Sequence, residues 1–300
     1  MSSTMLQLVQ QTTNELGLTA PTYVAGNTSE LTVQLLALMN AAGYELLKEY
    51  DWRAVQKEYR FYTQAISTTG DAIDGSYQLL NVANTTGLNN KWMVTGTGVP
   101  QDCYVVSVVG STVTLNQPLE QSGIGVTLNF GQTKYDLPPD YEVVTDRTQW
   151  DKTKHWEMLG PEDAQQWQWL KSGYISTGPR LRWRILGQYF QIWPIMSTQE
   201  YLGFEYRSKA WAESDTGLPK NSFTADTDTT IFDDRLMVLL TKLKFFQIKN
   251  FDTTALQQTY DRYLSVVKSN DKGAATLSFA PYPSKVLIGY ANIPDTGYGS

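Results

Sequence analysis

The 300-residue sequence predicts an α+β protein: a helical bundle body with antiparallel β elements, an inserted small β module and an extended C-terminal arm. Three observations lead to this prediction. Apolar residues recur with helical spacing in residues 1–55 and 232–270. Residues 64–130 are rich in Gly, Thr, Asn, Ser and Val and poor in charge, which is typical of short strands joined by turns. Residues 271–300 combine apolar side chains with prolines and have no helical period.

Two helices are predicted in the N-terminal region. The first covers residues 4–16, where apolar side chains form a broad face, and Gly17 ends it. The second starts after Asn27, which can cap it while Glu30 returns the hydrogen bond, and it continues to Tyr50. Apolar residues lie on nearly all sides of this helix, so we expect several neighbours to bury it.

The inserted module follows a strand predicted from the alternation in residues 57–63. Its short β runs, separated by glycine-containing turns, are residues 91–94, 104–109, 112–115 and 126–130. We interpret it as a separate antiparallel module, and a continuous β domain without separate identity is the alternative. Pro138 and Pro139 then force an extended turn that closes it.

Strands and helices alternate in the remainder of the chain. A helix is predicted to start at Pro161, and strands at residues 181–185 and 189–192, which form a hairpin, and at residues 201–207. The last two helices are predicted to start at Asp233 and Asp252. Three domains are predicted: a body of residues 1–63 and 131–270, an inserted module of residues 64–130, and an arm of residues 271–300.

The composition indicates a surface that meets partners. Hydrophobic residues make up 41 % of the chain and charged residues only 18 %, while Trp (9) and Tyr (18) are plentiful. Amphipathic aromatic side chains are enriched where proteins contact one another. The alternative explanation is a core rich in tryptophan.

The charge balance argues against nucleic-acid affinity. Lys and Arg number 24 against 30 acidic residues, giving a formal charge of −6, and no basic run occurs. DNA could still pass such a surface without binding to it. The first residues lack a signal peptide, no apolar run reaches membrane-spanning length, and the single Cys103 excludes an internal disulfide. We therefore expect synthesis and assembly in a cytoplasm and no membrane partner.

Residues that carry catalysis or bind metals are scarce. The only histidine is His155, in a polar segment, so a two-histidine zinc site is excluded and a structural or solvent-exposed role is expected. Gly96 and Gly98 lack the third glycine and the lysine of a phosphate loop. The acidic residues within 213–234 lack the spacing of a calcium loop. We expect no catalytic residues, no metal and no cofactor.

One enzymatic alternative survives this search. Glycoside hydrolysis needs two carboxylates and aromatic surfaces for sugar rings, and the pair to test first is Glu157 and Glu162, near Trp156 and Trp167. Capping and turn roles explain both carboxylates more simply. A glycan-binding module is the third function class kept open.

Several segments resemble the head-to-tail adaptor, or connector, proteins of tailed bacteriophages, chiefly those with short tails. The segments that carry the resemblance are residues 5–18, 35–52, 135–141, 160–167 and 204–206. Within the inserted module, residues 96–100, 105–108 and 111–115 resemble β modules of phage structural proteins.

This resemblance implies a structural virion protein located in the neck and assembled in the host cytoplasm. It implies a dodecameric ring that joins the portal protein to a tail nozzle or tube protein and surrounds a channel through which the genome passes without specific binding. The arm would reach the portal.

The arm is too apolar for a solvated linker, and its prolines prevent a stable helix. An extended segment bound to a neighbouring protein reconciles these two properties. The residues expected to bind the portal are Phe279, Tyr282, Val286, Leu287, Ile288, Tyr290 and Ile293.

Overall fold

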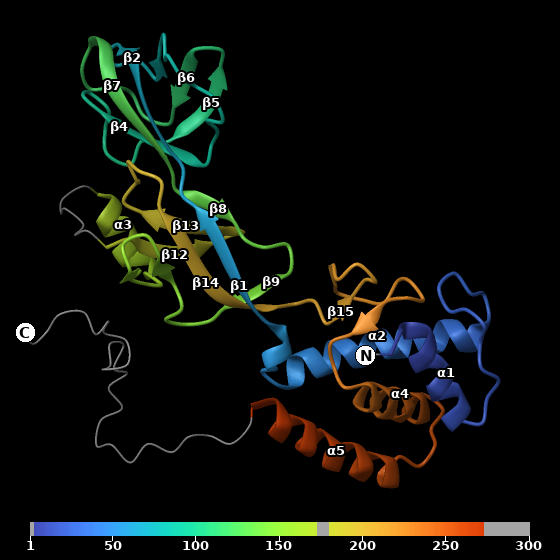
Figure 1. Ribbon diagram of the computed structural model, residues 1–300. Coiled ribbons are helices and arrows are strands. Elements are labelled where there is room, and N and C mark those ends of the chain that lie inside the picture. The colour runs from blue at the N-terminus through green and yellow to red at the C-terminus, as the bar shows by residue number, and fades with distance from the viewer. Residues whose placement is uncertain (1–2, 173–179, 273–300) are drawn as a thin grey trace, which may run out of the picture.

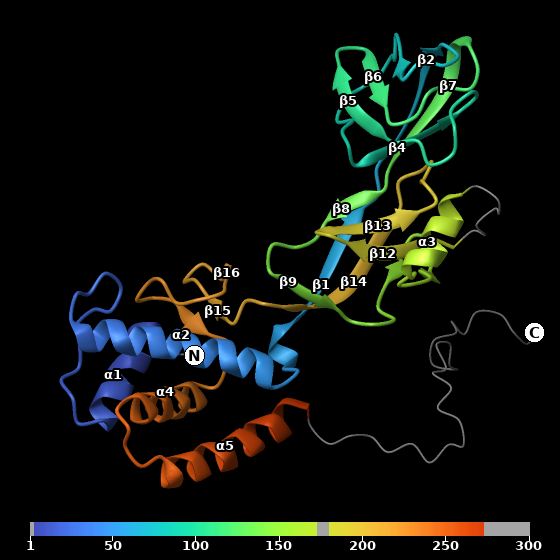
Figure 2. The same ribbon diagram turned by 180° about the vertical axis from the view of Figure 1, so that it is seen from behind.

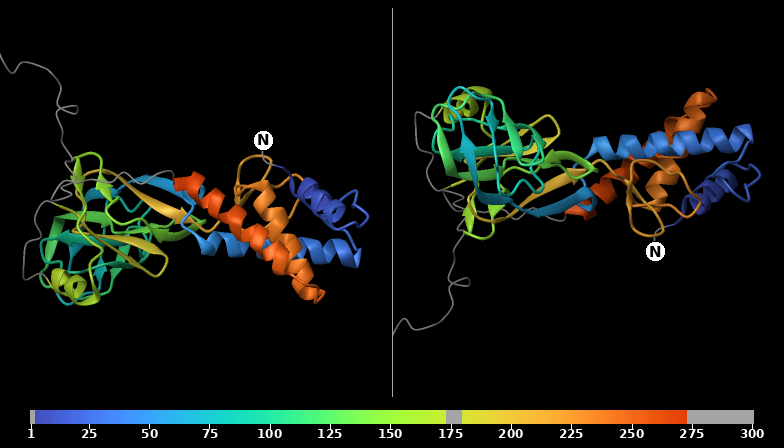
Figure 3. Two further views of the ribbon diagram at one scale, coloured as in Figure 1. Left: turned by 90° about the horizontal axis from the view of Figure 1, so that it is seen from below. Right: turned by 90° about the horizontal axis from the view of Figure 1, so that it is seen from above.

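The computed structural model describes residues 3–172 and 180–272. Figures 1 and 2 show an elongated molecule with helices at one end, β-sheets in the middle and a β module at the other end. Figure 3 shows the same order from below and above. Both the N-terminal helices and the last helices of the chain lie at this helical end.

Four helices build the helical end: α1 (Met5–Glu15), α2 (Glu30–Glu49), α4 (Asp234–Ile248) and α5 (Thr254–Lys272). Helix α1 begins with a capping box, in which Thr4 and Gln7 exchange side-chain and backbone hydrogen bonds. Helix α2 has Ser29 at its N-cap, because Asn27 instead accepts a hydrogen bond from the Ser29 amide. Asp233 caps α4 as expected, accepting from the Leu236 amide at 3.0 Å.

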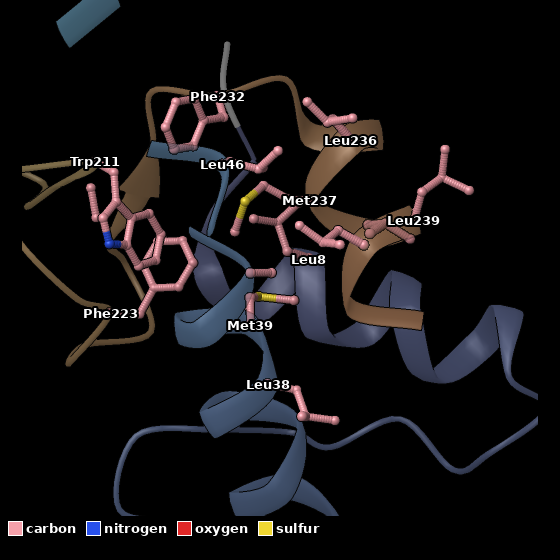
Figure 4. Packing of buried hydrophobic residues seen from close by; sticks show 14 of the residues in the cluster. Leu8, Leu38, Met39, Leu46, Trp211, Phe223, Phe232, Leu236, Met237 and Leu239 are labelled. Carbon is pink, nitrogen blue, oxygen red and sulfur yellow. The ribbon is translucent and has the colours of Figure 1, made fainter. Parts of the chain in front are cut away.

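The buried face of each helix at this end contributes to one hydrophobic core. Figure 4 shows Leu8 of α1, Met39 and Leu46 of α2 and Met237 of α4 side by side. Trp211 closes one side of this core and contacts Phe223 edge to face, with ring centroids 4.8 Å apart. Segments far apart in sequence therefore depend on one another for their burial.

Two sheets form the middle of the molecule. In the larger sheet β1 (Gln56–Tyr62) pairs with β14 (Tyr201–Ser208), followed by β10 (Trp150–Asp151) and β11 (Trp156–Glu157), while β9 (Tyr141–Val144) also pairs with β14. The smaller sheet has the order β12 (Arg182–Leu186), β13 (Tyr189–Trp193), β8 (Lys134–Asp136). Their facing sides share an aromatic core that includes Trp183, Phe190 and Phe204, whose rings stack.

The far module has its own core and two three-stranded sheets. One sheet contains β2 (Ala65–Ala72), β7 (Gly123–Gln132) and β4 (Trp92–Gly96), and the other contains β3 (Gln78–Leu79), β6 (Thr112–Leu115) and β5 (Val105–Val109). The remaining elements are η1 (Arg53–Val55), α3 (Ala164–Lys171), β15 (Ala212–Glu213), β16 (Pro219–Lys220) and β17 (Thr229–Thr230).

The predicted helical bundle body is wrong. The described residues form seventeen strands in five sheets and five α-helices, and the centre of the molecule is built from sheets. The physical reason is the pairing of all of β1 with residues Tyr201 to Arg207 of β14, which creates a sheet with an aromatic core between the helical end and the module. The α3 helix also starts later than expected, at Ala164, with Asp163 as its cap.

A buried carboxylate joins β1, β9 and β14. Asp140 accepts hydrogen bonds from Lys57 Nζ at 2.9 Å, Tyr206 Oη at 2.8 Å and Ser208 Oγ at 2.8 Å. Burial alone would raise the pKa of Asp140, but these donors outweigh burial and lower its pKa below the ordinary value. The ionised form is therefore the one that the fold stabilises.

We expect Asp140→Ala to lower the free energy of unfolding by about 3 kcal/mol at neutral pH, because three donors lose their acceptor. Since the folded pKa is lowered, this contribution is present above the unfolded pKa and is lost as the pH falls through the folded pKa. Urea unfolding of both proteins at several pH values should show the difference shrinking below about pH 4. Asp146→Ala, at an exposed carboxylate, is the control. An equal loss in both variants, or a difference that does not change with pH, would refute this role.

Candidate assembly surfaces

The predicted portal-binding residues all lie outside the described residues, which end within α5 at Lys272. The structure does describe the surface from which the arm departs. A groove of about 330 Å³ runs beside the last turns of α5, and its lining includes Trp52, Phe232, Tyr263 and Val267. Asn270 and Asp271, shortly before the last described residue Lys272, complete the groove.

The lining of this groove combines apolar side chains with polar ones. Tyr263 donates a hydrogen bond to Asp233 at 3.0 Å, and burial together with this bond raises the pKa of Tyr263. The Arg53 amide donates to the carboxylate of Asp271 at 2.9 Å, which ties the end of α5 to η1. The arrangement suits apolar side chains of an extended segment and offers no reactive group.

The helical end also exposes apolar side chains at two places. Val33 and Tyr44 lie on the outer side of α2, away from the core. Ile248 and Phe251 are 57 % and 58 % exposed where α4 turns into α5. These are the exposed apolar side chains that the helical end offers to a protein contact.

The two carboxylates of the enzymatic alternative have different environments. Glu162 is buried and forms an ion pair with Arg182, with Oε1 and Nη1 2.6 Å apart, whereas Glu157 lies on β11 opposite Trp150. Trp167 is buried in a different cluster from the exposed Trp156. Glu162 therefore has a structural partner, and the predicted pair gains no support.

The structure also describes the surroundings of the remaining residues that could act in catalysis or bind a metal. His155 is exposed and occupies a turn with φ of +59°. Burial raises the pKa of the Cys103 thiol to about 11, so the thiolate is scarce at neutral pH. Within residues 3–172 and 180–272, no group of three or more acidic, histidine or cysteine residues is placed to hold a metal. None of the helices in the same ranges has the length and apolar character needed to cross a bilayer.

The sequence model of the SU10 adaptor protein family matches residues 102–281, which is 180 of the 300 residues. The chain belongs to the SU10 adaptor protein family. It is therefore a bacteriophage structural adaptor and a component of the virion, and this family is a structural one. A search of curated proteins found no match.

The matched range tells which parts of the adaptor are common to the family. It contains the later strands of the module, most of the middle sheets and both C-terminal helices, whereas α1, α2 and β1 precede it. Of the predicted portal-binding residues only Phe279 lies within it. The sequence prediction missed the groove beside α5, because its residues come from three separate segments and share no local pattern.

Proposed function

We propose that this adaptor forms a ring that joins the portal to the tail of a short-tailed phage and lines the channel for the genome. The observation that carries the proposal is the family match over 180 of the 300 residues. We infer a ring of twelve copies, located in the neck, assembled in the host cytoplasm and in contact with a tail nozzle or tube protein.

The two exposed apolar places at the helical end support ring formation. A closed ring needs two different contact surfaces on each copy, so that one surface meets the other on the next copy. The outer side of α2 and the α4–α5 corner supply two such surfaces. An acidic chain with formal charge −6 suits a channel through which DNA passes without binding.

We also propose the division into a body (1–63 and 131–270), a module (64–130) and a portal-binding arm (271–300). The separate hydrophobic core of the module supports its boundary. The arm would carry its seven apolar residues, Phe279 to Ile293, from the rim of the α5 groove to the portal. Helix α5 includes Lys272, so experiments on the arm begin at Gly273.

The test is a low-resolution image of the parent particle labelled with an antibody fragment against the module. We expect ring-shaped density in the neck with the label at its outer edge. A label on the capsid surface or at the tail tip would refute the proposal.

A matched pair of variants tests the ring contacts. Phe251→Ser should prevent ring closure when the adaptor is mixed with portal, because it removes an exposed aromatic anchor. Tyr77→Ser, on the module, is the control with a comparably exposed aromatic residue (54 %). Light scattering measures both, and closed rings of Phe251→Ser would show that this corner is not a subunit contact.

A further inference from the structure

A small cavity lies where the module meets the middle sheets. It has a volume of about 160 Å³, and its walls come from β4, the turn before β5, β8, β13 and α3. Figures 1 and 2 show β13 and α3 directly beside the base of the module. At about 30 Å³ for each water, the cavity has room for roughly five waters, and a cavity of about 150 Å³ is known to hold one six-membered ring.

Gln191 is an unpartnered polar group in this wall. The residue is only 8 % exposed, and its side-chain amide makes no hydrogen bond to any other residue that the structure describes. The amide lines the cavity, so it is available to a ligand or to water there. Lys134 stands directly opposite Gln191 in the β8–β13 register and lines the same cavity.

The lining is basic although the protein is acidic. It contains three lysines and one carboxylate, Asp102. Lys171 Nζ lies 2.8 Å from Asp102 Oδ1, and Lys91 pairs with Asp136. Among the lysines that line the cavity, Lys134 has no carboxylate partner in the described part of the chain. Its Nζ lies 5.5 Å from the centroid of the Tyr104 ring.

Aromatic rings complete the walls. Trp92, Trp167 and Trp193 line the cavity together with Tyr104. The three tryptophans are at most 5 % exposed and back the walls, whereas Tyr104 is 39 % exposed and offers an aromatic surface to a ring compound. The amide and the ammonium group meet the polar edge of that compound. A positive charge favours a carboxylate at that edge.

The geometry points to a binding site for a carboxylated sugar, a hexuronic acid, at the junction of the module and the body. Lys134 binds the carboxylate, Gln191 hydrogen-bonds a hydroxyl group, and Tyr104 contacts the ring. Free hexuronate and the terminal residue of an acidic polysaccharide share this chemistry.

The experiment is a titration of the full chain with glucuronate, followed by tryptophan fluorescence and calorimetry. We expect saturable binding of glucuronate and at least about tenfold weaker binding of glucose, which lacks the carboxylate. An oligouronide that binds more tightly than the monomer identifies a polysaccharide as the source, and equal affinity identifies the free sugar.

Variants assign the binding to the cavity. Lys134→Met should weaken glucuronate binding by about tenfold or more, and Gln191→Leu by about threefold to tenfold. Lys209→Met removes the same charge at an exposed lysine outside the cavity and should leave binding unchanged. Circular dichroism confirms that each variant is folded.

Three results would overturn the inference: no saturable binding of glucuronate, glucose bound as tightly as glucuronate, or folded Lys134→Met that binds like the parent. Ring formation by the same preparations is measured separately. A failure of sugar binding would therefore leave the adaptor function intact, and a failure of ring formation would leave the site intact.

Discussion

Truncation after Lys272 is expected to abolish binding to the portal while the rest of the adaptor stays folded. The removed residues include all seven apolar side chains from Phe279 to Ile293. Loss of two interface anchors at about 2 kcal/mol each already weakens binding more than about 100-fold. The cut keeps Asp271, whose carboxylate accepts the Arg53 amide, so α5 retains its contact with η1.

Binding to immobilised portal rings measures the effect, and thermal unfolding checks the fold. Leu287→Asp in the full chain is the matched variant, because it adds a charge to the arm without shortening it. It should also weaken binding. If the truncated adaptor binds portal rings with unchanged affinity, the arm is not the segment that binds the portal.

Trp211→Ala is expected to cost about 3–5 kcal/mol in the free energy of unfolding, because it empties the side of the helical core that Figure 4 shows. Trp211 is fully buried against Phe223 and α2. Trp169→Ala is the matched control, since that side chain is 49 % exposed on α3 and should cost less than about 1 kcal/mol. Chemical denaturation measures both. Similar losses in the two variants would contradict the packing role of Trp211.

Gly43 provides an independent check of the same contact. A Cβ at this position would lie 2.5 Å from three atoms of the Trp211 ring, which cannot yield without moving the core. Gly43→Ala should therefore destabilise the protein, although alanine normally stabilises a helix by about 1 kcal/mol. The loss should shrink in the Trp211→Leu background. Equal costs in both backgrounds would show that the two residues do not interact.

Local patterns in the sequence predicted the helices well. The expected helix over residues 4–16 corresponds to α1, and Asp233 caps α4. These features depend on neighbouring residues, so spacing and capping chemistry reveal them. The run at residues 112–115 likewise corresponds to β6.

The middle of the molecule could not be predicted in the same way. Strand β1 pairs with β14, and nothing in either segment identifies a partner so far along the chain. Strands such as β10 and β15 have two residues each, too few for any period to appear. The junction cavity has the same origin, since its walls come from separate segments brought together by tertiary packing.

The shared core of the helical end has a consequence for synthesis of the protein. Helices α1 and α2 emerge from the ribosome early, but α4, which covers them, starts about 185 residues after α2 ends. At a synthesis rate of about 5–20 residues per second, the apolar faces of α1 and α2 stay uncovered by α4 for roughly 10–40 seconds. A nascent chain interrupted before α4 therefore cannot complete this core. The apolar faces of the N-terminal helices are therefore fully buried only in chains whose translation has passed α4. Prematurely terminated chains still expose these faces, and they differ in this way from complete chains before any subunits associate.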